Sequence, residues 1–151
     1  MRENTDILEQ FRRKDRNRTG YHFISDERFN SLTIGIRKQG AIILRGGEEV
    51  ERHLDMFDAG ASSVGDILYF REQVTITEVL EEIRHFEQNK QGLNNDKNHI
   101  IRTLLNEIDA KESIIRDAKK YQIPREEIEE TKQQLKELHK VLKKEVSICV
   151  K

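Results

Sequence analysis

Residues 75–88 have the sequence Thr-Ile-Thr-Glu-Val-Leu-Glu-Glu-Ile-Arg-His-Phe-Glu-Gln. Apolar side chains recur in it with the period of an amphipathic helix, three or four residues apart, at Ile76, Val79, Leu80, Ile83 and Phe86. Thr75 or Thr77 can cap the first turn, because a hydroxyl oxygen accepts a hydrogen bond from a backbone N–H there. The stretch therefore predicts a helix over residues 75–90 with one apolar side.

Two more helices are predicted after this one. Residues 92–96 (Gly-Leu-Asn-Asn-Asp) interrupt the apolar period, which returns from about residue 98 to residue 121. Pro124 then marks the start of a third helix, with Glu126 and Glu127 in the first turn, where the helix dipole favours acidic side chains. We expect this helix to run to about residue 146 and to pack on the rest of the domain, since it is too short for an independent coiled coil.

The chain before residue 75 predicts a small sheet. Residues 32–36 and 41–45 are rich in aliphatic and β-branched residues and are separated by Gln39-Gly40, which favours strand, turn and strand. Residues 66–71 predict a third strand. The whole chain is predicted to be one α+β domain, residues 1–151, in which a small antiparallel sheet within 32–71 is followed by three packed helices within 75–146. Residues 1–20 are predicted as a short helix and a basic loop.

The composition excludes several classes of protein. The chain has 151 residues, and 27 basic side chains face 28 acidic ones, so no overall field attracts it to nucleic acid or to an anionic membrane. The single cysteine, Cys149, excludes an internal disulfide framework and a cysteine-rich zinc module. No apolar run is long enough for a signal peptide or a transmembrane segment. We therefore expect no membrane partner and a cytoplasmic location.

The polar side of the helix at 75–90 holds the residues that could carry chemistry. Glu81 and His85 are one turn apart, with Glu82 beside them. A charged cluster of this kind is usually a solvated helix face, which is one interpretation. On the next helix Glu107 falls on or beside the apolar side, where a carboxylate needs a cation, a metal ion, strong donors or a place at the rim. Catalytic zinc sites use three ligands from His and carboxylates, and Glu81, His85 and Glu107 would supply three.

These residues resemble the motif of the gluzincin metallopeptidases, in which a His-Glu-x-x-His helix is followed by a helix that supplies a glutamate. The corresponding segments are Glu81-Glu82-Ile83-Arg84-His85 and Asn106-Glu107-Ile108-Asp109-Ala110. The resemblance implies Zn²⁺ as cofactor, His85 and Glu107 as metal ligands, and Glu82 as the catalytic base that takes a proton from the metal-bound water. Glu81 stands where the family has its first His, so the ligand set has an extra carboxylate, and a different divalent metal is an open alternative.

A longer part of the chain resembles the zincin-like C-terminal domains of bacterial polymorphic toxins and their phage-associated relatives. The similar segments are Ile67–Arg71, Leu80–Gln88, Leu105–Glu112 and Tyr121–Glu127. The resemblance implies a peptidase-like toxin or effector domain, whose partner is a protein substrate or a cognate immunity protein. It also implies delivery as part of a secreted toxin as an alternative to a cytoplasmic location.

Two other functions remain open on the sequence. One is a non-enzymatic interaction or structural domain of a phage or toxin system, which needs neither a metal ion nor a base. The other is a toxin domain that acts on nucleic acid and binds phosphates through the five basic side chains within Arg12–Arg18. Acidic residues in the same segment, and the near-zero net charge, make nucleic acid the less favoured partner.

Overall fold

The computed structural model describes residues 20–150, and their side chains as far as residue 148. Backbone contacts divide the chain into two compact units, Met1–Phe86 and Glu87–Lys151. The division falls inside a helix, and the single domain stays a prediction. The expected N-terminal helix and the basic residues Arg12–Arg18 lie outside the described residues.

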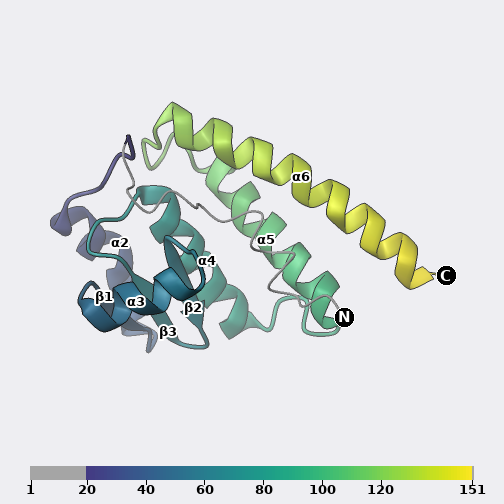
Figure 1. Ribbon diagram of the computed structural model, residues 1–151, viewed down its shortest axis with the longest axis horizontal. Helices are drawn as coiled ribbons and strands as arrows, with labels where there is room; N and C mark the ends of the chain where they lie inside the picture. Colours follow the sequence, from purple (N-terminus) through teal and green to yellow (C-terminus); the bar gives the residue numbers. More distant parts are fainter. Residues whose placement is uncertain (1–19, 151) are drawn as a thin grey trace. The chain divides into compact units, whose positions relative to one another are not determined.

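The first unit is built on a three-stranded sheet with strand order β1-β3-β2 (Figure 1). β1 (Ile42–Arg45) is parallel to β3 (Ile67–Phe70), whereas β2 (Ala61–Val64) is antiparallel to β3. The α+β class is confirmed, but the sheet is mixed and not antiparallel throughout. The reason is that β2 carries the chain back against the direction of β1, and β3 then returns in the direction of β1 and inserts between the two.

Two helices of this unit were not predicted. α2 (Asp26–Lys38) includes residues 32–36, so the strand expected there is wrong. The helix is favoured because the Ser25 side chain accepts a hydrogen bond from Arg28 N at 3.1 Å, which caps its first turn. α3 (Glu48–Met56) follows β1 directly. The strands expected at 41–45 and 66–71 coincide with β1 and β3.

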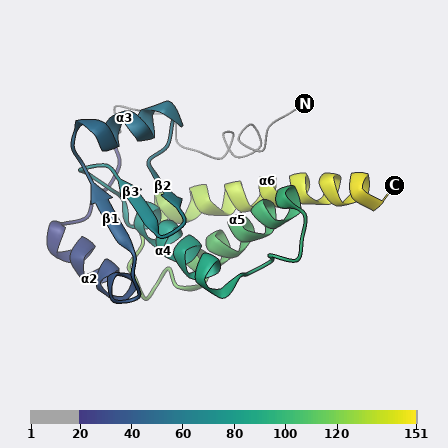
Figure 2. The same cartoon turned by 90° about the horizontal axis from the view of Figure 1, so that it is seen from below.

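α2 and α3 cover opposite faces of the sheet (Figure 2). Side chains alternate along β3, so Leu68 and Phe70 point to one face and Tyr69 to the other. On the first face Leu68 and Phe70 join the hydrophobic core together with residues of α2 and α4, among them Phe29, Ile36, Val79 and Phe86. On the second face the Tyr69 ring stacks on His53 of α3, with centroids 4.2 Å apart. The sheet is thus the middle layer of this unit.

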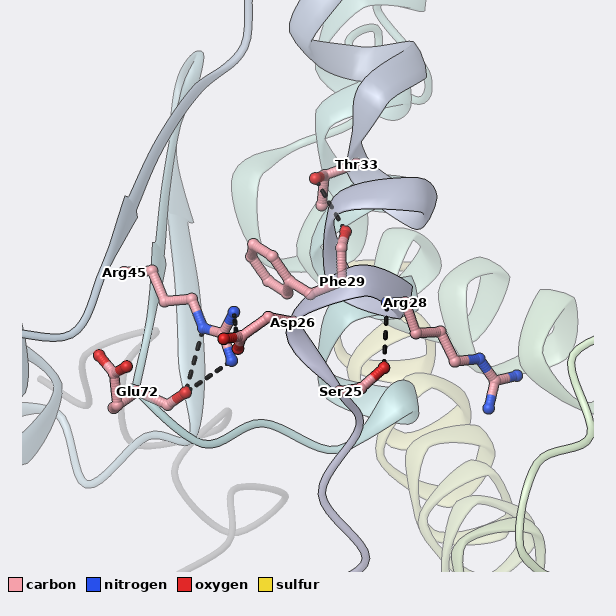
Figure 3. A network of polar contacts seen from close by, with 7 residues as sticks. All are labelled: Ser25, Asp26, Arg28, Phe29, Thr33, Arg45 and Glu72. Atoms are coloured by element: carbon pink, nitrogen blue, oxygen red, sulfur yellow. Dashed lines mark hydrogen bonds and ion pairs between the residues drawn. The ribbon is translucent and has the colours of Figure 1, made fainter.

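Arg45, the last residue of β1, joins the strand to α2 and to the segment after β3 (Figure 3). Its guanidinium donates hydrogen bonds of 3.1 and 2.7 Å to the Glu72 carbonyl and forms a 3.1 Å ion pair with Asp26. The same group lies over the Phe29 ring, 4.3 Å from its centroid, which is within the range of a cation–π contact. These contacts fix the first turn of α2 beside the segment that leads from β3 into the next helix.

The second unit contains the C-terminal end of α4 (Ile76–Gln91) with α5 (His99–Arg116) and α6 (Arg125–Val150). These are the three helices predicted at 75–90, 98–121 and 124–146. α5 and α6 lie side by side, as both views show (Figures 1 and 2). The buried apolar residues of this pair are Leu104, Ile108, Ala110, Ile114 and Leu138. In the described part of the chain, no helix is both long enough and apolar enough to cross a membrane.

Candidate functional site

α4 begins with a reciprocal capping box. Thr75 N donates to Glu78 Oε1 at 2.9 Å, and Glu78 N donates to Thr75 Oγ1 at 3.2 Å. Of the two residues predicted as caps, Thr75 is therefore the one that occupies the position before the helix. Its bonds satisfy two backbone N–H groups that the helix itself leaves without partners. The start of α4 is fixed by these bonds one turn before Glu81 and Glu82.

The polar side of α4 is buried. Glu78 and Glu82 are each only 8% exposed, and Gln88 is 2% exposed. Glu81 and His85 are half-buried. The apolar side is buried as well, since Ile76, Val79 and Phe86 are 1% exposed or less. A solvated face therefore does not describe Glu78, Glu82 and Gln88, whereas Glu81 and His85 keep part of their surface exposed.

Gln88 connects the end of α4 with the middle of α5 inside the second unit. Its Nε2 donates to the backbone oxygen of Asn106 and to Asp109 Oδ2, with both distances 2.8 Å. The Asn106 side chain is held in addition by Asn94, whose Nδ2 donates to Asn106 Oδ1 at 2.9 Å. The sequence assigned no role to Gln88. The available signal was its place seven residues after Glu81, on the same side of the helix.

Glu107 is half-buried on α5, as its position beside the apolar side predicted. Lys111, one turn later, is 2% exposed. The i, i+4 spacing places an ammonium group on the side of α5 where the Glu107 carboxylate lies. A cation within the chain is thus available to Glu107, which is one of the outcomes expected for a buried carboxylate. Lys111 was missed, although it continues the apolar period Leu104, Ile108, Lys111, Ile115.

The predicted metal ligands lie in both units. Glu81 and His85 are one turn apart on α4 in the first unit, and Glu107 is on α5 in the second. Within the described residues, no group of three His, Cys, Asp or Glu side chains is arranged so that it could hold a metal ion. The ligand set Glu81, His85 and Glu107 stays a prediction, as does the role of Glu82 as base.

A second charged cluster surrounds Arg71, just after β3. The Arg71 side chain is 9% exposed, and its guanidinium donates hydrogen bonds of 3.1 and 2.8 Å to the Ala59 carbonyl. It also forms ion pairs with Asp55 at 2.9 Å and with Glu51 at 3.4 Å, both on α3. These bonds fasten α3 and the chain after it to the sheet. They account for the burial of the arginine, so we assign this cluster a structural role.

Comparisons of the chain with models of protein families, with curated proteins and with solved structures found no match. The function is therefore argued from the residues themselves.

Proposed function

We propose that the chain is a metal-dependent, peptidase-like hydrolase domain with Glu82 as its general base. The observation that carries the proposal is the burial of Glu82, 8% exposed, on the helix that also carries Glu81 and His85. Taking a carboxylate out of water costs several kcal/mol, about 3 or more, unless other groups compensate. Glu82 does interact with other groups of the chain, which hold its carboxylate in place on α4. The role as a toxin or effector domain, with a protein substrate or an immunity protein as partner, rests on the sequence resemblance.

The donor groups are of the kinds that zinc accepts. Glu81 and His85 offer a carboxylate and an imidazole one turn apart, and Glu107 is the third ligand on the sequence resemblance alone. A bound zinc ion would supply a Lewis acid that activates water and polarises the scissile carbonyl. Because the described side chains do not already enclose an ion, Glu81 and His85 have to turn toward it. The affinity then includes the cost of ordering them.

Glu82 has the chemistry of a general base in this scheme. Its carboxylate accepts a proton from the attacking water and returns it to the leaving amine, which converts a poor leaving group into a good one. Burial keeps bulk water from competing for the carboxylate, and the helix backbone fixes the direction in which it points. His85, three residues later, is half-buried on the same helix.

Metal analysis of the full chain, purified without chelator, tests the proposal together with hydrolysis of casein as an unstructured substrate. Glu82→Gln keeps the shape of the side chain and removes the base, so metal content should persist while hydrolysis is lost. His85→Ala and Glu107→Ala each remove a ligand and should lower metal content itself. The proposal is overturned if the wild type holds no stoichiometric divalent metal, or if both ligand variants hold as much as the wild type.

Two controls separate a metal site from a general loss of stability. Glu78→Gln changes an equally buried acid of α4 that serves the capping box, and it should leave metal content and hydrolysis unchanged. His139→Ala removes an exposed imidazole and should also be silent. A fall in metal content with either control would show that the assay reports folding and not ligation.

An ion pair between Glu107 and Lys111, which the i, i+4 spacing allows, would be the competing explanation for Glu107. If that is the whole role of Glu107, the double variant Glu107→Gln/Lys111→Met should recover the stability that Glu107→Gln loses and keep the wild-type metal content. If Glu107 is a ligand, the double variant should still bind metal more weakly than the wild type. The comparison is made by urea unfolding and metal analysis on the same preparations.

A further inference from the structure

β1 is an edge strand whose outer side is open. The strand order β1-β3-β2 gives it one neighbour, β3 (Figure 2). Ile42 N donates to Asp66 O at 2.8 Å, and the parallel register continues from there, so the backbone groups of every second residue from Ile42 face β3. The N–H and C=O groups of Ile43 and Arg45 alternate with these and point away from the sheet. In the part of the chain that the structure describes, no residue bonds to those outward groups.

This edge lacks the features by which proteins usually block the addition of a strand, namely a lysine, a proline, a bulge or a covering element. Residues 39–44 (Gln-Gly-Ala-Ile-Ile-Leu) contain no charge and no proline, and β1 pairs with β3 without a bulge. Leu44 is the register partner of Tyr69, so Leu44 and Ile42 lie on the face of the sheet that α3 covers. They are nevertheless 38% and 53% exposed. The edge therefore offers another strand both hydrogen bonds and apolar contacts.

We propose that a second copy of this chain occupies the edge, with the two β1 strands antiparallel about a two-fold axis at Ile43. In this register the N–H and C=O groups of Ile43 bond to those of Ile43 in the other copy. Ile42 of each copy lies opposite Leu44 of the other on the same face, so both exposed side chains gain a partner. A register centred on Leu44 is less favourable, because it would place Ile42 opposite Gly46, which has no side chain.

The distribution of charge favours a second copy as the occupant. Arg45 lies opposite Ala41 in the proposed register, so no like charges meet along the paired strands. The Arg45 guanidinium is held on its own chain by the Glu72 carbonyl and by Asp26. The net charge of the chain is -1, so two copies repel each other little.

The dimer is expected to be weak. Each copy contributes a strand of four residues, and the pairing joins two three-stranded sheets. Such a contact falls in the class of small interfaces, below about 1,200 Å², which belong to transient complexes. We expect a dissociation constant in the micromolar range, about 1–100 µM.

Sedimentation velocity of the full chain over about 1–200 µM is the test, because this range spans the expected dissociation constant. The wild type should change from monomer to dimer as its concentration rises. Ile42→Lys/Leu44→Lys places lysines opposite each other twice across the axis and should weaken the dimer by about 10-fold or more. The matched control is Val64→Lys, which adds a charge at a 60% exposed position on β2, the other edge of the sheet. This control should dimerise like the wild type.

A charge-swapped variant tests the register. Ile42→Lys/Leu44→Glu places each lysine opposite a glutamate of the other copy, so this variant should dimerise more tightly than the double-lysine variant by about 10-fold or more. In a register centred on Leu44 the two glutamates would face each other, and the variant would stay monomeric. That result would overturn the axis at Ile43.

Two other results would overturn the proposal as a whole. One is a wild type that stays monomeric over the entire range, and the other is a Val64→Lys variant that loses the dimer as fully as the double-lysine variant does. Circular dichroism checks that each variant folds. Should the double-lysine variant fail to fold, Ile42→Lys takes its place with the same expected direction. The test does not involve a metal ion, so its outcome is independent of the proposed function.

Discussion

Asp55 and Arg71 form a 2.9 Å ion pair between α3 and the residue that follows β3, and the arginine side chain is only 9% exposed. Two further hydrogen bonds from the same guanidinium reach the Ala59 carbonyl. One side chain therefore holds a helix and the chain that follows it against the central strand. The planar guanidinium of arginine makes this arrangement possible. Its Nε and Nη2 both donate to the Ala59 carbonyl oxygen, while Nη1 faces the Asp55 carboxylate.

Arg71→Lys should destabilise the protein although it keeps the charge. A lysine cannot reproduce the paired bonds to the Ala59 carbonyl, and that residue is 3% exposed, so its oxygen would lose its donors in a buried place. We expect a loss of about 1–3 kcal/mol in the free energy of unfolding, measured by urea denaturation. Arg52→Lys is the control, since the Arg52 pair with Glu48 on α3 is 68% and 85% exposed and should change stability by less than about 0.5 kcal/mol. Equal effects at the two positions would contradict the structural role of Arg71.

Thr75→Val should weaken the start of α4. The substitution keeps the branched shape of a fully buried side chain and deletes the hydroxyl that accepts from Glu78 N. Removing a cap of this kind costs about 1 kcal/mol. Glu78→Gln keeps an oxygen for Thr75 N and should change the free energy of unfolding much less. Chemical denaturation of the two variants side by side measures the difference, and a larger loss in Glu78→Gln would mean that the box is not the main role of these residues.

Two glycine substitutions should act in opposite directions. Gly46 follows β1 with a φ of +70°, a backbone conformation that costs a residue with a Cβ about 1–2 kcal/mol. An added Cβ would also collide with the Glu72 side chain, so Gly46→Ala should destabilise the protein by at least that amount. Gly35 lies inside α2, where an added Cβ meets nothing within 4 Å. Gly35→Ala should therefore stabilise the protein by about 0.5–1 kcal/mol. Thermal unfolding decides the signs, and a stabilising Gly46→Ala would contradict the described turn.

Leu138→Ala tests whether α6 stabilises the second unit. Leu138 is fully buried, so its truncation should cost about 2–5 kcal/mol. Val146 lies further along α6 and is 42% exposed, and Val146→Ala should stay within about 0.5 kcal/mol of the wild type. Truncation of the chain after Ile123 should remove the partner of α5 altogether. If the truncated chain melts like the full one, α6 does not support α5.

The sequence predicted an element correctly where its apolar period was repeated over a long stretch, and missed it where the stretch was short. α4, α5 and α6 each have 16 residues or more, and their apolar periods identified them. α3 has nine residues, so its period, Val50, Leu54 and Phe57, was too short to stand out. Residues 32–36 have a local composition typical of strands, whereas the longer pattern of Phe29, Thr33 and Ile36 favours the helix that forms. β2, Ala-Ser-Ser-Val, has little strand propensity and is a strand because it pairs with β3.

The candidate site shows a second limit of the sequence. The period of one helix reveals its apolar side, but the burial of Glu82 and Gln88 depends on the elements that cover the opposite side. No pattern within α4 contains that information. Lys111 is different, because a lysine within an apolar period was visible in the sequence and indicated a buried charge.

The parallel pairing of β1 with β3 has a consequence for the order of folding. β2 and β3 close as a hairpin around the two residues Gly65 and Asp66, whereas Ile42 of β1 has to find Ile67 across the whole of α3 and β2. Such distant pairing pays its loop-closure entropy before it gains any contact. During synthesis β1 leaves the ribosome before its partner strand β3 exists. Until then the backbone of Ile42 and Leu44 is unpaired and could pair with a strand of another chain. The central strand is thus the last of the three to be made, and the sheet is completed only when it arrives.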